Sequence, residues 1–198
     1  GTTSRGLGDV YKRQGNVISG NFKIGNEVKL KIDSSLRELI KKNHSATHLL
    51  HAALRNNLGP HVAQRGSLVN ENKLRFDFSH NKQISSKQID TIQKEVTNII
   101  SNTCETQIDI KSQEEAIKLG AMALFGEKYG EEVRVVTLGE HNNKPYSIEL
   151  CGGTHVSNVK DIEKFYIISE ESVSSGVRRI EACTCLLYTS PSPRDVVP

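Results

Sequence analysis

The chain has 198 residues, of which 36% are hydrophobic and 25% are charged, and it carries a formal net charge of +3 at pH 7. These proportions are typical of a soluble globular chain that buries a core, and no apolar run approaches the roughly 20 residues that a membrane helix needs. The composition argues against a membrane protein, while the weak positive charge permits a nucleic-acid partner without arguing for one.

The two ends of the chain do not resemble native protein sequence. The stretches RGLGDVYKRQ at 5–14 and CLLYTSPSPRD at 185–195 can be written in codons that are reverse complements over most of their length. Both also resemble the transposase adapter used in shotgun sequencing libraries. We therefore predict that residues 1–14 and 185–198 are adapter-derived, and we expect residues 15–184 to be a piece of a longer protein.

Residues 15–33 alternate apolar and polar side chains, a pattern that predicts two or three strands. The apolar positions are Val17, Phe22, Ile24, Val28, Leu30 and Ile32. Because so few strands cannot bury a face alone, we expect them to be the edge of a β-domain that begins upstream. A helix is predicted from about Ser34 to Gly59-Pro60, with Ser35 and Glu38 spaced as a capping box.

The rest of the chain is predicted to be rich in strands. Residues 67–79 predict a hairpin that turns at 70–72, with Leu74, Phe76 and Phe78 on one face. A second amphipathic helix carries Ile89, Ile92, Val96, Ile99 and Ile100. Further strands are predicted at 107–111, 133–138, 146–150, 163–169 and 177–182, with a short helix at 113–119. This order predicts an α+β domain with helices packed on a largely antiparallel sheet.

The long predicted helix carries the stretch NHSATHLLH, with His44, His48 and His51. Residues four apart lie on one face of a helix, one turn apart, so His44 and His48 can direct two ring nitrogens at one point. A transition metal requires this spacing of two helical ligands. The alternative is a pair of histidines that lie at the helix surface or are hydrogen-bonded in the core.

A second pair of candidate ligands follows a predicted strand, in the stretch ELCGGTHV. Cys151 and His155 are also four positions apart, and Gly152 and Gly153 allow the backbone to turn sharply between them. Together the two pairs form a set of three histidines and one cysteine, which suits tetrahedral Zn²⁺. A tight turn with incidental neighbours is the alternative, and the ligand types alone do not decide whether such zinc is catalytic or structural.

Three cysteines, Cys104, Cys151 and Cys183, lie outside the predicted adapter segments. An odd number without close pairing is typical of a reduced, intracellular protein, and we expect a cytoplasmic location. In such a protein a cysteine near histidines is more often a metal ligand or a nucleophile than half of a disulfide.

Six stretches together carry a family resemblance: NHSATHLLHAALR, HVAQRGSLV, LRFDFSH, GAMALFGEKYG, CGGTH and SGVRRIEA. They resemble the editing domain of alanyl-tRNA synthetase, and more distantly the free-standing alanyl-tRNA editing proteins. The resemblance covers residues 15–184 and implies that 34–184 form a zinc-containing tRNA editing domain associated with class II synthetases. It also implies that 15–33 are the C-terminal edge of a small β-barrel.

The activity that the resemblance implies is hydrolysis of the ester that joins serine or glycine to the acceptor end of tRNA(Ala). An activation pocket sized for alanine excludes glycine and serine poorly, so a second sieve is required. His44, His48, Cys151 and His155 would hold Zn²⁺, and Thr47 and Gln64 match motif positions that the family associates with editing. For the general base, Asp77, His80 and His51 are candidates.

The tRNA end needs cations near its phosphates, and the candidates are Arg65, Lys128, Arg178 and Arg179. Adjacent strand residues face opposite sides, so at most one of Arg178 and Arg179 is expected to point into the site. The ATP-binding core of a class II synthetase is not present, so aminoacylation is expected of a parent alanine-tRNA ligase and not of this chain.

Three other functions stay open at this point. The first is the related editing domain of threonyl-tRNA synthetase, which has a similar ligand layout. The second is a non-catalytic tRNA-binding module stabilised by zinc, which would bind tRNA with a steep salt dependence and leave the ester intact. The third, a zinc peptidase, lacks the glutamate of H-E-x-x-H, because position 45 is Ser45.

Overall fold

A computed structural model describes residues 16–122 and 130–184. The two predicted adapter segments and Lys128 lie outside the described residues. The elements follow one another as helix, hairpin, helix, strand, short helix and four strands, with a 3₁₀ turn (η1) before the last hairpin. Their bounds are α1 Ser34–Leu58, β1 Gln64–Val69, β2 Leu74–Ser79, α2 Ser86–Ser101, β3 Gln107–Ser112, α3 Gln113–Lys118, β4 Glu132–His141, β5 Lys144–Leu150, η1 Val159–Ile162, β6 Tyr166–Ser174 and β7 Val177–Cys183.

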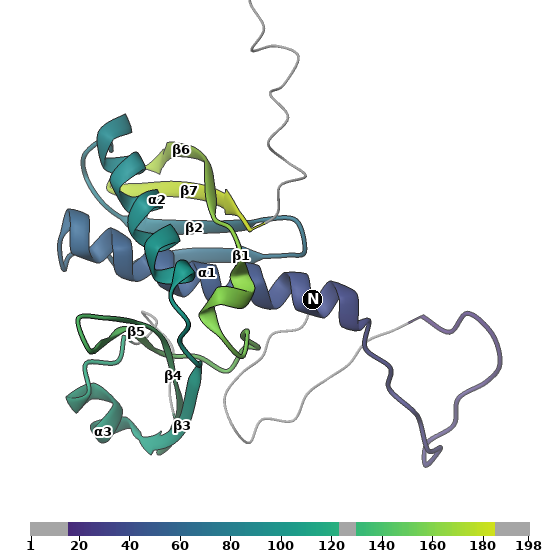
Figure 1. Ribbon diagram of the computed structural model, residues 1–198. Helices are drawn as coiled ribbons and strands as arrows, with labels where there is room; N and C mark the ends of the chain where they lie inside the picture. Colours follow the sequence, from purple (N-terminus) through teal and green to yellow (C-terminus); the bar gives the residue numbers. More distant parts are fainter. Residues whose placement is uncertain (1–15, 123–129, 185–198) are drawn as a thin grey trace, which may run out of the picture.

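The strands form two antiparallel sheets, and neither of these closes into a barrel. One sheet has four strands in the order β1-β2-β7-β6, and the other has three in the order β3-β4-β5. Helix α1 lies between the two sheets and contacts both, while α2 packs beside it (Figure 1). The prediction of an α+β domain with helices on antiparallel sheets is therefore confirmed.

The central part of α1 is buried along its whole circumference. Residues 45–54 are all buried, because one side of this stretch packs on the four-stranded sheet and the other side packs on the three-stranded sheet. A helix in such a position places any polar side chain it carries inside the protein, where that side chain needs a partner. This position explains how the histidines of α1 come to lie in the interior.

The predicted hairpin and second helix are confirmed in detail. Leu74, Phe76 and Phe78 are each 0% exposed and face the helices. Helix α2 buries Ile92, Val96, Ile99 and Ile100, and it begins with a capping box of Ser85 and Gln88.

Several sequence predictions were wrong. The structure has no strand in residues 16–33, and the apolar side chains of that stretch are exposed, because no described element packs against them. Helix α1 is capped by Asp33, whose Oδ1 accepts a hydrogen bond from the Leu36 N–H at 3.0 Å, so Ser35 and Glu38 do not form the cap. The strand predicted at 163–169 begins at Tyr166, because η1 ends at Ile162 and its C-cap, Glu163, has a φ of 69°.

Candidate metal centre and its adjoining cavity

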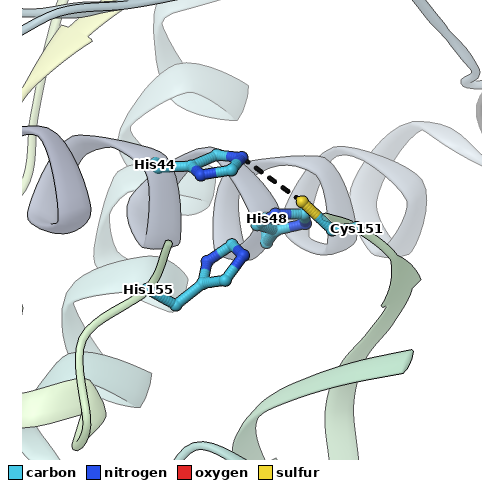
Figure 2. Close-up of side chains that lie close together, drawn as sticks. All are labelled: His44, His48, Cys151 and His155. Carbon is cyan, nitrogen blue, oxygen red and sulfur yellow. Dashed lines mark hydrogen bonds between the residues drawn. The ribbon is translucent and has the colours of Figure 1, made fainter. Parts of the chain in front are cut away.

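The two predicted ligand pairs meet between α1 and the end of β5. His44 and His48 lie one turn apart on α1, and Cys151 and His155 lie in the loop that follows β5. Each side chain offers one ligand atom, a ring nitrogen or the cysteine sulfur, and these four atoms lie within 4.8 Å of one another. Figure 2 shows the four side chains turned toward one another from opposite sides. The sequence spacing thus predicted a real spatial cluster.

Hydrogen bonds hold the imidazole rings with one nitrogen toward the cluster. His44 Nδ1 lies 3.2 Å from the Thr154 carbonyl oxygen, and its Nε2 lies 3.6 Å from Cys151 Sγ. The Nε2 atoms of His48 and His155 are buried and make no hydrogen bond to a described residue. Buried polar nitrogens without partners are unfavourable unless something binds them. Three imidazole nitrogens and one thiolate are a donor set that fits Zn²⁺.

The electrostatics of the cluster favour donor atoms with free lone pairs. Burial tends to raise the pKa of Cys151, but the neighbouring rings of His155, His44 and His48 outweigh it and lower that pKa to about 3. Burial, together with the charge of His48, lowers the pKa of His155 to about 4. At neutral pH the cysteine is therefore a thiolate and His155 is a neutral imidazole, the forms that bind metal.

His48 differs because a carboxylate lies behind it. Burial acts to lower its pKa, yet the charge of Glu149 and contacts with Glu149 and Cys151 raise it to about 10. Burial acts to raise the pKa of Glu149, and its two histidine partners lower it to about 2. In the absence of metal, His48 therefore carries a proton that a metal ion must displace.

The two glycines of the loop have different surroundings. Neither Gly152 nor Gly153 has a φ in the left-handed region, so the loop does not use the conformational freedom that the sequence suggested. A Cβ at Gly153 would lie 2.1 Å from Cε1 of His44, whereas a Cβ at Gly152 would meet nothing within 4 Å. Gly153 is required because the His44 ring occupies the space of a side chain.

Arg134 supports the loop from β4. One of its guanidinium nitrogens, Nη1, donates to the carbonyl oxygens of Cys151 at 2.6 Å and Gly153 at 2.8 Å. The backbone N–H of Cys151 donates in turn to the Arg134 carbonyl oxygen at 3.1 Å. The loop that carries Cys151 and His155 is thereby attached to the three-stranded sheet.

A cavity of about 100 Å³ adjoins the cluster. Its wall includes three of the four candidate ligands together with Thr47 and Gln64, which the sequence had also selected. Ser67, Phe76, Glu149 and Leu150 complete the wall. The Thr47 hydroxyl donates to the Asn43 carbonyl oxygen at 2.8 Å, which leaves its oxygen free to accept a hydrogen bond from a group in the cavity.

Comparison with known proteins shows what this chain is similar to. Residues 133–181 match the family model described as "Threonyl and Alanyl tRNA synthetase second additional domain". Over these residues the chain is similar to that domain. It is also similar to an alanine-tRNA ligase of Rhizorhabdus wittichii, with 52% identity over 186 residues. Alanine-tRNA ligases of Parvibaculum lavamentivorans and Sphingopyxis alaskensis are each 50% identical.

The resemblance inferred from the six motifs is therefore confirmed. Each of these matches covers 92% of the chain but only 21% of the relative, so the chain spans about a fifth of the length of the curated relatives. The part matched by the family model contains β5, Cys151 and His155, while His44 and His48 lie before it on α1. The candidate metal centre joins the second additional domain to the preceding helix.

Three other predicted site residues lie away from the cavity. Asp77 faces the opposite side of β2 from Phe76, and it accepts two hydrogen bonds from the Arg179 guanidinium at 2.7 and 2.9 Å. The charges of Arg178 and Glu170 are paired on the other face. As expected for adjacent strand residues, the two arginines face opposite sides, but each is already paired with an acidic side chain.

The remaining predicted site residues do not lie together. His51 lies beside the cluster and shares Glu149 with His48, whereas His80 lies 2.9 Å from His61, measured between ring nitrogens, in a separate surface hollow. Arg65 is exposed on β1, next to Gln64. Lys128 lies outside the described residues, so its predicted role stays a prediction.

Sequence reasoning missed Glu149, Arg134 and Ser67. Alternation on β5 could have found Glu149, because a period of two places it on the same side of the strand as Cys151. The contact of Arg134 with the loop depends on the pairing of β4 with β5. Ser67 lines the cavity because of where the β1–β2 hairpin lies in the fold. No local signal in the sequence marks either of them.

Within the described residues, no helix is long and apolar enough to cross a membrane.

Proposed function

We propose that this domain is an aminoacyl-tRNA deacylase that hydrolyses Ser-tRNA(Ala) and Gly-tRNA(Ala). The observation that carries the proposal is the cavity of about 100 Å³ whose wall includes three of the four candidate metal ligands. Since a water molecule takes about 30 Å³ of the liquid, such a cavity suits a small aminoacyl group and not a large one. The similarity to alanine-tRNA ligases supports tRNA(Ala) as the carrier.

The cavity wall provides the means to select serine. The free lone pairs of Thr47 and the carboxamide of Gln64 can hydrogen-bond a serine hydroxyl, which alanine lacks. A site with buried polar groups discriminates strongly against a substrate that leaves those groups unpaired. Phe76 and Leu150 form the apolar part of the wall and limit the size of the side chain that enters.

His44, His48, Cys151 and His155 would hold Zn²⁺ beside this cavity. A zinc ion there would supply a Lewis acid that polarises an ester carbonyl or lowers the pKa of a water molecule. The thiolate of Cys151 and the neutral His155 are ready to bind, while His48 must release its proton. Glu149 already accepts two histidine N–H groups, and Asp77 is paired with Arg179, so neither carboxylate has a free oxygen for a base role.

Arg65 is the described cation that we propose for the tRNA end. It follows Gln64, a residue of the cavity wall, on the strand at the edge of the four-stranded sheet. A guanidinium there is suited to a phosphate of the acceptor strand. Arg178 and Arg179 would have to leave Glu170 and Asp77 to take that role.

The test compares the release of serine and of alanine from tRNA(Ala) by the 198-residue chain and by Thr47→Val, which keeps the shape of the side chain and removes the hydroxyl. The proposal predicts that serine is released faster than alanine, and that the variant loses most of this preference. Binding of tRNA with no release of either amino acid would instead indicate a binding module. Preferential release from Ser-tRNA(Thr) would indicate the threonyl type of domain.

A further inference from the structure

A buried carboxylate links two histidines of α1, only one of which is a candidate metal ligand. Glu149 is 4% exposed on β5. Its Oε2 lies 2.5 Å from His48 Nδ1, and its Oε1 lies 2.9 Å from His51 Nδ1. Both carboxylate oxygens therefore have a ring N–H as partner. We refer to His48, Glu149 and His51 as the buried bridge.

The contact with Glu149 determines which nitrogen of His48 can bind a metal ion. A carboxylate accepts hydrogen bonds and donates none, so the Nδ1 atom that faces it carries the hydrogen. The other nitrogen, Nε2, faces the cluster and makes no hydrogen bond to a described residue. Carboxylates behind a metal-bound histidine fix the ring orientation and make the ligand more basic.

His51 acts on the other side of the carboxylate. It lies three residues after His48 on α1, so the two rings lie on one face of the helix. Its ring also packs against Phe76, with ring centroids 5.1 Å apart, and it is not one of the four candidate ligands. With one oxygen held by His51, the carboxylate cannot rotate away from His48. His51 thus acts on the metal centre through Glu149.

We infer that Glu149 is a positioning residue for metal binding at this centre and that His51 secures it. The inference rests on the metal binding in the proposed function and extends it to two residues that do not touch the ion. A carboxylate that is 4% exposed and two buried imidazoles form a costly arrangement in a core. The geometry accounts for the arrangement, because removal of Glu149 or of His51 leaves the His48 ring less firmly held.

The test measures the affinity of the complete 198-residue chain for Zn²⁺ and Co²⁺ by competition with a chromophoric chelator. Glu149→Gln keeps the shape but presents one acceptor oxygen and one NH₂ donor, so one of the two histidine N–H groups loses its acceptor. We expect the affinity to fall about 10- to 100-fold. The matched control is Glu132→Gln, an exposed carboxylate on the neighbouring strand β4, which should bind like the original chain.

A second pair of variants separates positioning from folding. His51→Leu removes the N–H that holds Glu149, and His51→Asn restores an amide N–H near the position of Nδ1. We expect His51→Leu to weaken metal binding about tenfold and His51→Asn to recover most of that loss. The thiolate-to-Co²⁺ absorption of the fully loaded variants should stay unchanged, because the four ligands are the same.

The outcomes distinguish this inference from the proposed function. If the original chain binds no zinc, the metal part of the proposed function is refuted, and this inference with it. If the original chain binds zinc and Glu149→Gln binds as tightly as Glu132→Gln, this inference alone is overturned. If Glu149→Gln does not fold, His51→Leu decides, and equal affinity of His51→Leu and the original chain overturns the inference.

Discussion

Replacing Gly153 by alanine should expel His44 from the metal centre. The new Cβ would lie 2.1 Å from Cε1 and 2.7 Å from Nδ1 of His44. Carbon atoms in contact need about 3.5 Å, so the ring must retreat by more than about 1 Å. Metal–ligand distances hold within about 0.2 Å, so such a displacement removes one of the four ligands. The backbone at Gly153 accepts alanine, since its φ is not in the left-handed region.

We expect the zinc affinity of Gly153→Ala to fall on the order of 100-fold or more. The matched control is Gly152→Ala, whose Cβ meets nothing within 4 Å. Zinc affinity is measured by chelator competition, and thermal unfolding is followed with and without metal. Metal at about 100 times its Kd stabilises the folded chain by about 2.7 kcal/mol, and this gain should nearly vanish in Gly153→Ala. Equal affinities of the two glycine variants would refute the placement of His44 beside the loop.

The pKa of His48 is raised to about 10, while the pKa values of Cys151 and His155 are lowered to about 3 and about 4. Zinc binding between about pH 7.5 and about pH 9 should therefore release close to one proton and become tighter as the pH rises. Calorimetry in buffers of different ionisation enthalpy measures the number of protons released, and a value of two or more would contradict this prediction. Replacing Arg134 by methionine should weaken zinc binding about tenfold, because the carbonyl oxygens of Cys151 and Gly153 lose their hydrogen-bond donor. An unchanged zinc affinity in chelator competition would show that Arg134 does not support the loop. The Arg179 hydrogen bonds hold the pKa of Asp77 below its ordinary value of 3.8, so the ion pair stabilises the fold above that pH and loses this effect as the pH falls through the lower pKa of the folded state. Asp77→Asn should therefore lower the thermal unfolding midpoint at pH 7 and leave it unchanged at strongly acid pH. An equal loss at both pH values would exclude the ion pair as the cause.

The sequence predicted the cluster of candidate metal ligands because its two halves are local patterns. A spacing of four residues places His44 and His48 on the same side of a helix, and this does not depend on the rest of the fold. The same holds for the hairpin, where alternation alone placed Leu74, Phe76 and Phe78 in the core. Local spacing cannot show that the end of β5 lies against α1. The two pairs were combined because together they supply a donor set that suits tetrahedral zinc.

Partners that are distant in sequence account for what was not predicted. Asp77 looked like a candidate base, but the register of β2 on β7 places it directly opposite Arg179. Glu149 could be assigned to a face of β5, yet its two partners on α1 depend on how the helix docks on the sheet. The strands expected in residues 16–33 failed for the opposite reason, since alternation forms a sheet only where a partner strand and a core face exist.

The central claim is that the cluster and its cavity form a metal-dependent editing site. The most direct measurement is the rate at which the 198-residue chain releases serine from Ser-tRNA(Ala), first stripped of metal and then reloaded with zinc, beside a Cys151→Ala variant. The account predicts release by the zinc-loaded chain, little release by the stripped chain, and little by Cys151→Ala at any zinc concentration. Equal rates in all three would contradict the claim.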